Sequence, residues 1–277
     1  MALFRVVCAA GLALLLVTAV TPARADDDAD NNGGSNGQDL TKPLTRLDLR
    51  YQYQTSGQDR DQATDTLKIR VDRPFEFGSG WSASLRADLP LALTNVTSSS
   101  NPGGNYQFGL GDLLTQAVLI KTVSRDFAWA VGTQLIFPTA STDAMGGGEY
   151  RVVPTLGARW NPPGFGDENW LEGIVRYDIS YAGDPGRATK RELQLQPMVN
   201  VALWQGWYFD LYPSSDIRYD AAAVRSGDTG RWFVPFDFLV GDKISRKLLV
   251  SLEISVPVVK EYHVYSFKSE ARVGFFF

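Results

Sequence analysis

Apolar and polar residues alternate along the last fifteen residues of the chain, positions 263–277. Every second residue from Tyr265 to Phe277 is apolar except Ser269. The residues between them, from 266 to 274, are polar, charged or glycine. A period of two residues is that of a β-strand, whose successive side chains point to opposite faces. The pattern therefore predicts a strand with one apolar face and one polar face.

Eleven further segments show the same period. The segment at 109–121 alternates least well, because Leu110 and Val118 share a face with Asp112 and Gln116. Together with the last segment they predict twelve strands. The eleven lie at 45–54, 66–75, 81–91, 109–121, 127–137, 150–160, 170–181, 192–203, 207–219, 231–241 and 247–258.

The connections between these segments alternate in length. Short turns are expected at 78–80, 124–126, 204–206 and 243–246, and longer polar loops at 55–65, 93–107, 139–149, 182–191 and 220–230. Two connections, at 161–169 and 259–262, depart from this order. A soluble sandwich has no reason to sort loops by length, whereas a transmembrane barrel has short periplasmic turns and long extracellular loops. We therefore predict an all-β fold, a single transmembrane antiparallel up-and-down β-barrel of about twelve strands over residues 44–277.

The N-terminal residues have the pattern of a secretory signal peptide. Arg5 precedes an apolar stretch, and Ala23-Arg24-Ala25 is a small-x-small cleavage site. We expect residues 1–25 to be removed by cleavage, and with them Cys8, the only cysteine. No later segment has the roughly 18–20 consecutive apolar residues of a membrane-spanning helix. An exported protein of this kind is periplasmic, secreted or an outer-membrane barrel.

Residues 26–43 are rich in Asp, Asn and Gly. Their low apolar content predicts a disordered periplasmic tail. Asp28, Asp30, Asn32, Asn36 and Asp39 also fall on positions of a calcium-loop pattern. The usual final Glu and the flanking helices are missing, so a solvated tail is the preferred interpretation.

Charge and hydropathy add two constraints. The chain has a formal net charge of −4, which becomes −6 without Arg5 and Arg24, and this disfavours nucleic acid as a partner. The mean hydropathy of −0.15 is compatible with a barrel, because half of every strand faces water.

Prolines inside or at the ends of strands predict local irregularities in the wall, because proline removes a ladder donor. They are Pro74, Pro90, Pro138, Pro154, Pro197, Pro213, Pro235 and Pro257.

The polar faces carry both signs of charge. Barrels of about eight strands are filled by side chains and those of about sixteen enclose a channel, so twelve strands predict a narrow lumen. The candidate lumen residues are basic near the closure (Arg46, Arg50, Lys68, Arg70, Arg86, Lys268, Arg272) and acidic elsewhere (Glu172, Asp178, Glu192, Asp210, Asp216, Asp237, Glu253), with Asp112 and Glu270 added. Two interpretations remain open: a transverse field that orients solutes, or mutual pairing across a tight interior.

Catalytic and cofactor chemistry has little support. His263 is the only histidine, no Ser/His/acid spacing is evident, and a strand-end histidine is the preferred interpretation. Without histidine and cysteine clusters the mature chain offers no transition-metal site. We expect no catalytic residue, no cofactor and no metal.

Two resemblances extend this picture. The final strand, with Phe275 and Phe277, resembles the C-terminal assembly signal of Gram-negative outer-membrane barrels. Gly109-Leu110-Gly111-Asp112-Leu113 and Phe137-Pro138-Thr139 resemble motifs of the MetA-pathway of phenol degradation family of transporter-type barrels. The resemblance implies an outer-membrane barrel passing small, in part aromatic or hydrophobic, compounds.

These observations lead to one functional hypothesis and two alternatives. We expect an exported protein of the Gram-negative outer membrane that contacts its lipid, uses the barrel-assembly machinery and lets small molecules pass passively. The first alternative is a structural or adhesive barrel with a blocked lumen that acts through its loops. The second is a barrel-embedded lipid hydrolase, which would require His263.

Overall fold

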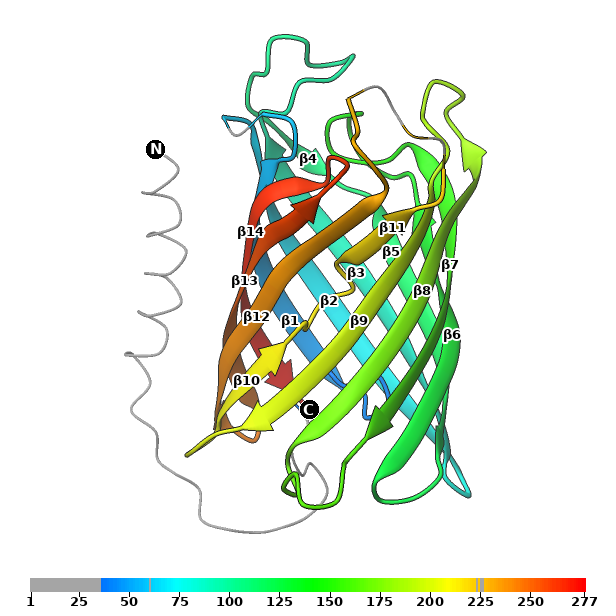
Figure 1. Cartoon of the computed structure of the whole chain (residues 1–277), viewed down its shortest axis with the longest axis vertical. Coiled ribbons are helices and arrows are strands. Elements are labelled where there is room, and N and C mark those ends of the chain that lie inside the picture. Colours follow the sequence, from blue (N-terminus) through cyan, green and yellow to red (C-terminus); the bar gives the residue numbers. More distant parts are fainter. Residues whose placement is uncertain (1–35, 60, 223, 225–226) are drawn as a thin grey trace.

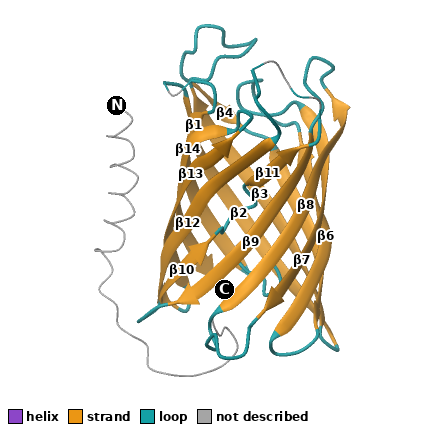
Figure 2. Cartoon of the chain, in the orientation of Figure 1, coloured by secondary structure: helices purple, strands orange, loops and turns teal. Residues whose placement is uncertain are grey.

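The structure, a computed structural model, describes residues 36–277 except 60, 223, 225 and 226. The predicted signal peptide, residues 1–25, and the first part of the predicted tail lie outside the described residues. The described chain forms antiparallel strands and no helix (Figures 1 and 2). Accordingly, no described segment is a helix long and apolar enough to cross a membrane.

The strands close into one barrel. They are β1 (Arg46–Ser56), β2 (Ala63–Gly78), β3 (Trp81–Thr94), β4 (Gln107–Leu110), β5 (Leu113–Thr122), β6 (Phe127–Phe137), β7 (Glu149–Trp160), β8 (Trp170–Gly183), β9 (Arg191–Ala202), β10 (Trp207–Leu211), β11 (Ile217–Asp220), β12 (Trp232–Ser245), β13 (Leu248–Lys260) and β14 (Tyr265–Phe276). The barrel closes where β1 pairs with β14, with Arg46 opposite Phe276 and Arg50 opposite Arg272.

The prediction of twelve strands is confirmed. β4 and β5 share one position in the wall beside β3, and β10 and β11 share another between β9 and β12. The wall therefore has twelve positions, two of which are interrupted. Turns are short at the end where the chain terminates, and the longer loops gather at the opposite end (Figure 1).

The two faces of the wall differ as the alternation predicts. Apolar side chains such as Leu67, Leu85 and Val131 are exposed on the outside, where lipid would cover them. Charged side chains such as Asp72 and Glu172 are buried on the inside. The barrel therefore has an apolar outer face and a polar interior.

Exposed aromatic side chains mark the two ends of the apolar band. Phe77, Trp160 and Trp204 lie at the end of the barrel where the chain terminates, whereas Phe108 and Tyr181 lie next to the long loops at the other end. Aromatic girdles of this kind sit at the two water boundaries of outer-membrane barrels. The band between them is the part of the wall that spans the membrane.

The weakly alternating segment at 109–121 is interrupted in the structure. β4 ends at Leu110 and β5 begins at Leu113, and the Asp112 carboxylate between them accepts backbone N–H groups of Ala140 (3.3 Å) and Gly147 (2.6 Å). Asp112, predicted to line the lumen, therefore anchors the 138–148 loop.

Candidate functional site: the barrel lumen

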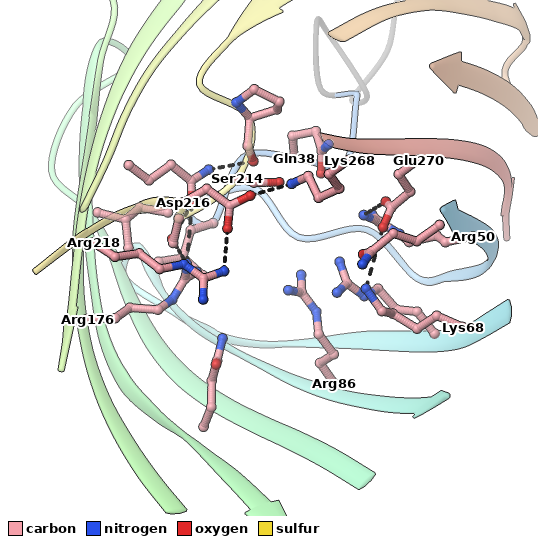
Figure 3. A pocket seen from close by; sticks show the side chains of 18 of the residues that line it. Gln38, Arg50, Lys68, Arg86, Arg176, Ser214, Asp216, Arg218, Lys268 and Glu270 are labelled. Atoms are coloured by element: carbon pink, nitrogen blue, oxygen red, sulfur yellow. Dashed lines mark hydrogen bonds and ion pairs between the residues drawn. The ribbon is translucent and has the colours of Figure 1, made fainter. Parts of the chain in front are cut away.

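A polar cavity of about 270 Å³ lies inside the barrel. Arg50 and Lys68 lie on one side of it, and Arg176 and Arg218 on the other (Figure 3). The basic lining residues are Arg50, Lys68, Arg70, Arg86, Arg176, Arg218 and Lys268, and the acidic ones are Asp216 and Glu270. Of the residues that the structure describes, seven basic and two acidic side chains therefore face this space.

Near the closure, the basic side chains are paired. Asp48 is fully buried and lies within ion-pair distance of Arg46 (3.6 Å), Arg50 (2.9 Å) and Arg272 (3.0 Å). Arg50 also binds Glu270 on β14 at 2.9 Å. One carboxylate thus holds three guanidinium groups at the seam of the barrel.

The next two strands continue this network. Arg70 binds Asp88 through two hydrogen bonds of 2.7 and 2.6 Å, in the fork geometry that arginine favours with a carboxylate. Asp72 accepts hydrogen bonds from Arg46 on one side and Arg86 on the other, both at 2.7 Å. Lys68 reaches Glu270 at 3.5 Å. Carboxylates on neighbouring strands therefore connect the arginine side chains of the wall through hydrogen bonds and ion pairs.

The predicted acids of β8 to β13 are mostly paired as well. Arg151 binds Asp178 at 2.5 Å, and Arg218 lies 2.6 Å from Asp216 and 3.6 Å from Glu192. Lys190 also binds Glu192, at 2.7 Å. Pairing therefore describes these contacts, and a transverse field across the lumen stays a prediction.

Sequence reasoning missed the partners that make this pairing possible. Asp48, Asp72 and Asp88 lie on the same polar faces as the predicted arginines, so the alternation itself was a signal for them. Arg176 and Arg218 are likewise on the polar faces of β8 and β11.

Three predicted acids come together at one point. Carboxylate oxygens of Asp216, Asp237 and Glu253 lie within 4.8 Å of one another, a spacing that suits a cation. The Lys268 ammonium binds Asp216 and lies 2.6 Å from Glu253, so it supplies a positive charge to this cluster. Asp237 is fully buried, and neither of its carboxylate oxygens has a hydrogen-bond partner among the described residues.

Residues 36–43, predicted to be disordered, instead enter the lumen. Asn36 donates to Asp210 at 2.9 Å, and Asp39 forms an ion pair with Arg159 at 2.8 Å. The Leu40 N–H donates to Glu172 at 2.9 Å. Composition alone predicts disorder here, whereas in the structure the polar lumen supplies hydrogen-bond and ion-pair partners in place of bulk water.

The segment is also held through its backbone and one apolar side chain. Arg46 donates to the Gly37 carbonyl, and Arg272 donates to the Asn36 carbonyl at 3.1 Å. Leu40 packs into a buried cluster with Val118, Ile120, Ala130 and Ile174. This cluster is an inward-facing apolar patch on β5, β6 and β8, and Leu40 occupies it.

The calcium-loop pattern falls largely outside the described residues. Of its positions, Asn36 and Asp39 are described, and both are engaged with protein groups. Asp39 also accepts the N–H of Thr41 at 2.7 Å and of Lys42 at 3.2 Å, forming a local turn.

The wall is interrupted between β10 and β11, around Pro213. Tyr212 still donates its N–H to the Asp237 carbonyl of β12 at 2.8 Å, but residues 213–216 leave the ladder and line the cavity. The Pro213 carbonyl accepts from Gln196 at 2.8 Å, and Ser214 donates to Glu253 at 2.8 Å. The predicted irregularity of the wall is confirmed here.

The extracellular side of the lumen is narrowed by aromatic residues. Phe233, Tyr262 and Tyr265 form a buried cluster, with 4.7 Å between the ring centroids of Phe233 and Tyr265. The Tyr262 hydroxyl donates to Glu192 at 2.9 Å. Both the N-terminal segment, residues 36–43, and this aromatic cluster therefore occupy part of the lumen around the cavity.

Outside the membrane band, the loops are tied to one another. Ser98, Ser99 and Ser100 donate hydroxyl hydrogen bonds to Asp143 of the 138–148 loop. The hydroxyl of Ser100, followed by those of Ser98 and Ser99, lowers the pKa of Asp143 below its usual value. These contacts link two extracellular loops.

The remaining predicted residues lie away from the cavity. His263 is exposed, with Nδ1 3.0 Å from the Gly57 carbonyl oxygen, in agreement with a strand-end position. Phe275 and Phe277 are exposed at the end of β14, while Phe276 packs inward with Tyr208 and Leu249. Their recognition by the assembly machinery stays a prediction.

Comparisons with known proteins agree with this architecture. The sequence matches the family model described as "Putative MetA-pathway of phenol degradation" over residues 25–233. None of the curated proteins gives a significant match. The fold is similar to the COG4313 outer membrane channel from Pseudomonas putida F1, with a TM-score of 0.67 and 13% identity over 93% of this chain and 100% of that chain. It is also similar to the NanC porin, with a TM-score of 0.53 and 12% identity over 83% of this chain and 98% of that one.

Proposed function

The chain belongs to the putative MetA-pathway of phenol degradation family, and from this premise we propose that it is an outer-membrane channel for passive passage of small molecules. The observation that carries the proposal is the polar cavity inside a closed barrel. A lumen that only had to stabilise the wall would be filled by side chains, as in the smallest barrels.

The obstructions around the cavity support a gated passage. Residues 36–43 belong to no strand, and residues 213–216 have left the ladder between β10 and β11. Both segments are held mainly by side-chain contacts, such as Asn36 with Asp210 and Gln196 with Pro213. They can therefore move while the hydrogen-bonded wall stays closed.

The lining favours polar solutes over apolar ones. Charged and amide side chains dominate the cavity, and the inward apolar patch is covered by Leu40.

Apolar or aromatic solutes have a second candidate route, which leads sideways through the wall of the barrel. Between β10 and β11, the wall lacks ladder pairs to β9 between Leu195 and Val199 and to β12 between Phe233 and Phe238, where the Asp237 carbonyl accepts the Tyr212 N–H. Pro197 and Pro235 occupy these unpaired stretches and have no N–H to leave unsatisfied.

Liposome swelling with the refolded mature protein tests the proposal. We expect small polar solutes to enter proteoliposomes faster than protein-free liposomes, with rates that fall as solute size increases. Equal rates with and without a heat-modifiable, correctly folded barrel would contradict the channel and favour the alternative of a blocked barrel that acts through its loops. Lipid hydrolysis abolished by His263→Ala would favour the enzyme.

A further inference from the structure

We propose that the lumen cavity binds small organic carboxylates, and that Arg176 and Arg86 receive the carboxylate. The inference rests on the proposed function, because it names the chemical class of solute that the lumen holds in transit. It follows from the unequal placement of acids and bases around the cavity.

The acidic partners of the wall arginines lie behind them. Asp72 and Asp88 bind Arg86 and Arg70, yet neither acid lines the cavity. The basic groups form the inner surface, and many of the compensating carboxylates are set back toward the wall. A solute in the cavity therefore meets guanidinium and ammonium groups first.

Among the described basic residues that line the cavity, Arg176 is the one without an ion-pair partner. Its side chain is buried, with 9% of the residue exposed, and its Nη1 donates to the neutral oxygens of Gln196 (3.3 Å) and Ser215. Among the described residues no carboxylate lies within ion-pair distance of it, and its buried Nε has no hydrogen-bond partner. A buried charge of this kind is costly unless a counter-ion joins it.

Arg86 offers donors to the same space. It binds Asp72 through Nε at 2.7 Å, and in Figure 3 its guanidinium end points into the cavity between Lys68 and Arg176. Two guanidinium groups that face one cavity suit a carboxylate, which accepts charge-assisted hydrogen bonds with both oxygens. The amide of Gln134 is a further lining group that can donate.

Binding to the full mature protein in detergent micelles tests this inference without requiring transport. The probe is 4-fluorobenzoate, followed by ¹⁹F NMR, and 4-fluorobenzyl alcohol is the neutral control. We expect the carboxylate to bind and the alcohol to bind at least about tenfold more weakly, as the loss of a charge-assisted hydrogen bond predicts. Arg176→Gln should weaken carboxylate binding by a similar factor. Arg176→Lys, which keeps the charge but not the fork, should weaken it less.

Arg125→Gln is the matched control, because Arg125 is exposed in a periplasmic turn, with 81% of its side chain accessible. We expect it to bind like the unmodified protein. Equal binding of the acid and the alcohol would overturn the inference, even if no arginine variant folded, and so would undiminished binding by a folded Arg176→Gln protein. Binding without liposome swelling would leave this inference standing and refute the channel. Liposome swelling without carboxylate binding would refute this inference and leave the channel standing.

Discussion

A chain that begins at Pro43 should conduct severalfold more current per channel than the mature protein. The deletion removes Asn36, Asp39 and Leu40, and with them the contacts to Asp210, Arg159 and the inward apolar patch. The vacated space joins the cavity to the periplasmic opening, so water and ions can replace the segment. Single-channel recording in planar bilayers measures the change.

A chain that begins at Ser35 is the matched control, since it keeps every contact described for the segment. We expect its conductance to equal that of the mature protein. If both shortened chains conduct like the mature protein, residues 36–42 do not obstruct the path.

Asp48→Asn should destabilise the barrel by about 3–5 kcal/mol, the cost of removing one partner from buried ion pairs. Asp48 lies between Arg46, Arg50 and Arg272 at the seam where β1 meets β14. The asparagine leaves these buried guanidinium groups with less compensation. Urea unfolding of the refolded protein in detergent, followed by tryptophan fluorescence, gives the difference.

Two further variants identify the cause of that loss. Arg46 and Arg50 keep Asp72 and Glu270, but Asp48 is the one described carboxylate that pairs with Arg272. Adding Arg272→Met to Asp48→Asn should therefore recover part of the stability. Asp167→Asn, in an exposed pair with Arg125, should have little effect. A loss that Arg272→Met leaves unchanged would contradict the charge explanation.

The wall could be predicted because a transmembrane strand obeys one simple rule. Its outer face meets lipid and its inner face meets polar groups, so β2 and β13 alternate clearly in the sequence. The predicted strand ends lie within a few residues of the observed ones. One interruption of the wall lies near Asp112, where the alternation is weak, and the other lies at Pro213, a proline inside a predicted strand.

The arrangement of the lumen could not be predicted in the same way. Alternation places Arg70 and Asp72 on one face, but the register between strands decides that Arg70 pairs with Asp88 and that Asp72 pairs with Arg86. The inward charges, considered without their partners, therefore suggested a transverse electric field across the lumen. Local ion pairing largely cancels this field. The exception is Arg176, which the register leaves without a carboxylate partner among the described residues.

The N-terminal segment shows a second limit of sequence reasoning. Its composition predicts disorder because Asn, Asp and Gly cannot form an apolar core. Inside a polar barrel that argument does not apply, because Asp210, Arg159 and Glu172 bind the same groups that water would solvate. Leu40 was the remaining signal, an apolar residue in a polar stretch that matches an apolar patch on the inner wall.

The most direct test of the account is a reversible tether of the N-terminal segment to the wall. The mature chain is expected to lack cysteine, so Asn36→Cys with Asp210→Cys introduces one pair at a point of direct contact. The pair is closed with a short bifunctional thiol reagent that a reductant cleaves, and the same single channel is recorded before and after reduction. We expect low conductance while the tether is closed and a stepwise increase when it opens, and neither single variant should show this increase. Equal conductance in the two states would contradict a lumen gated by this segment.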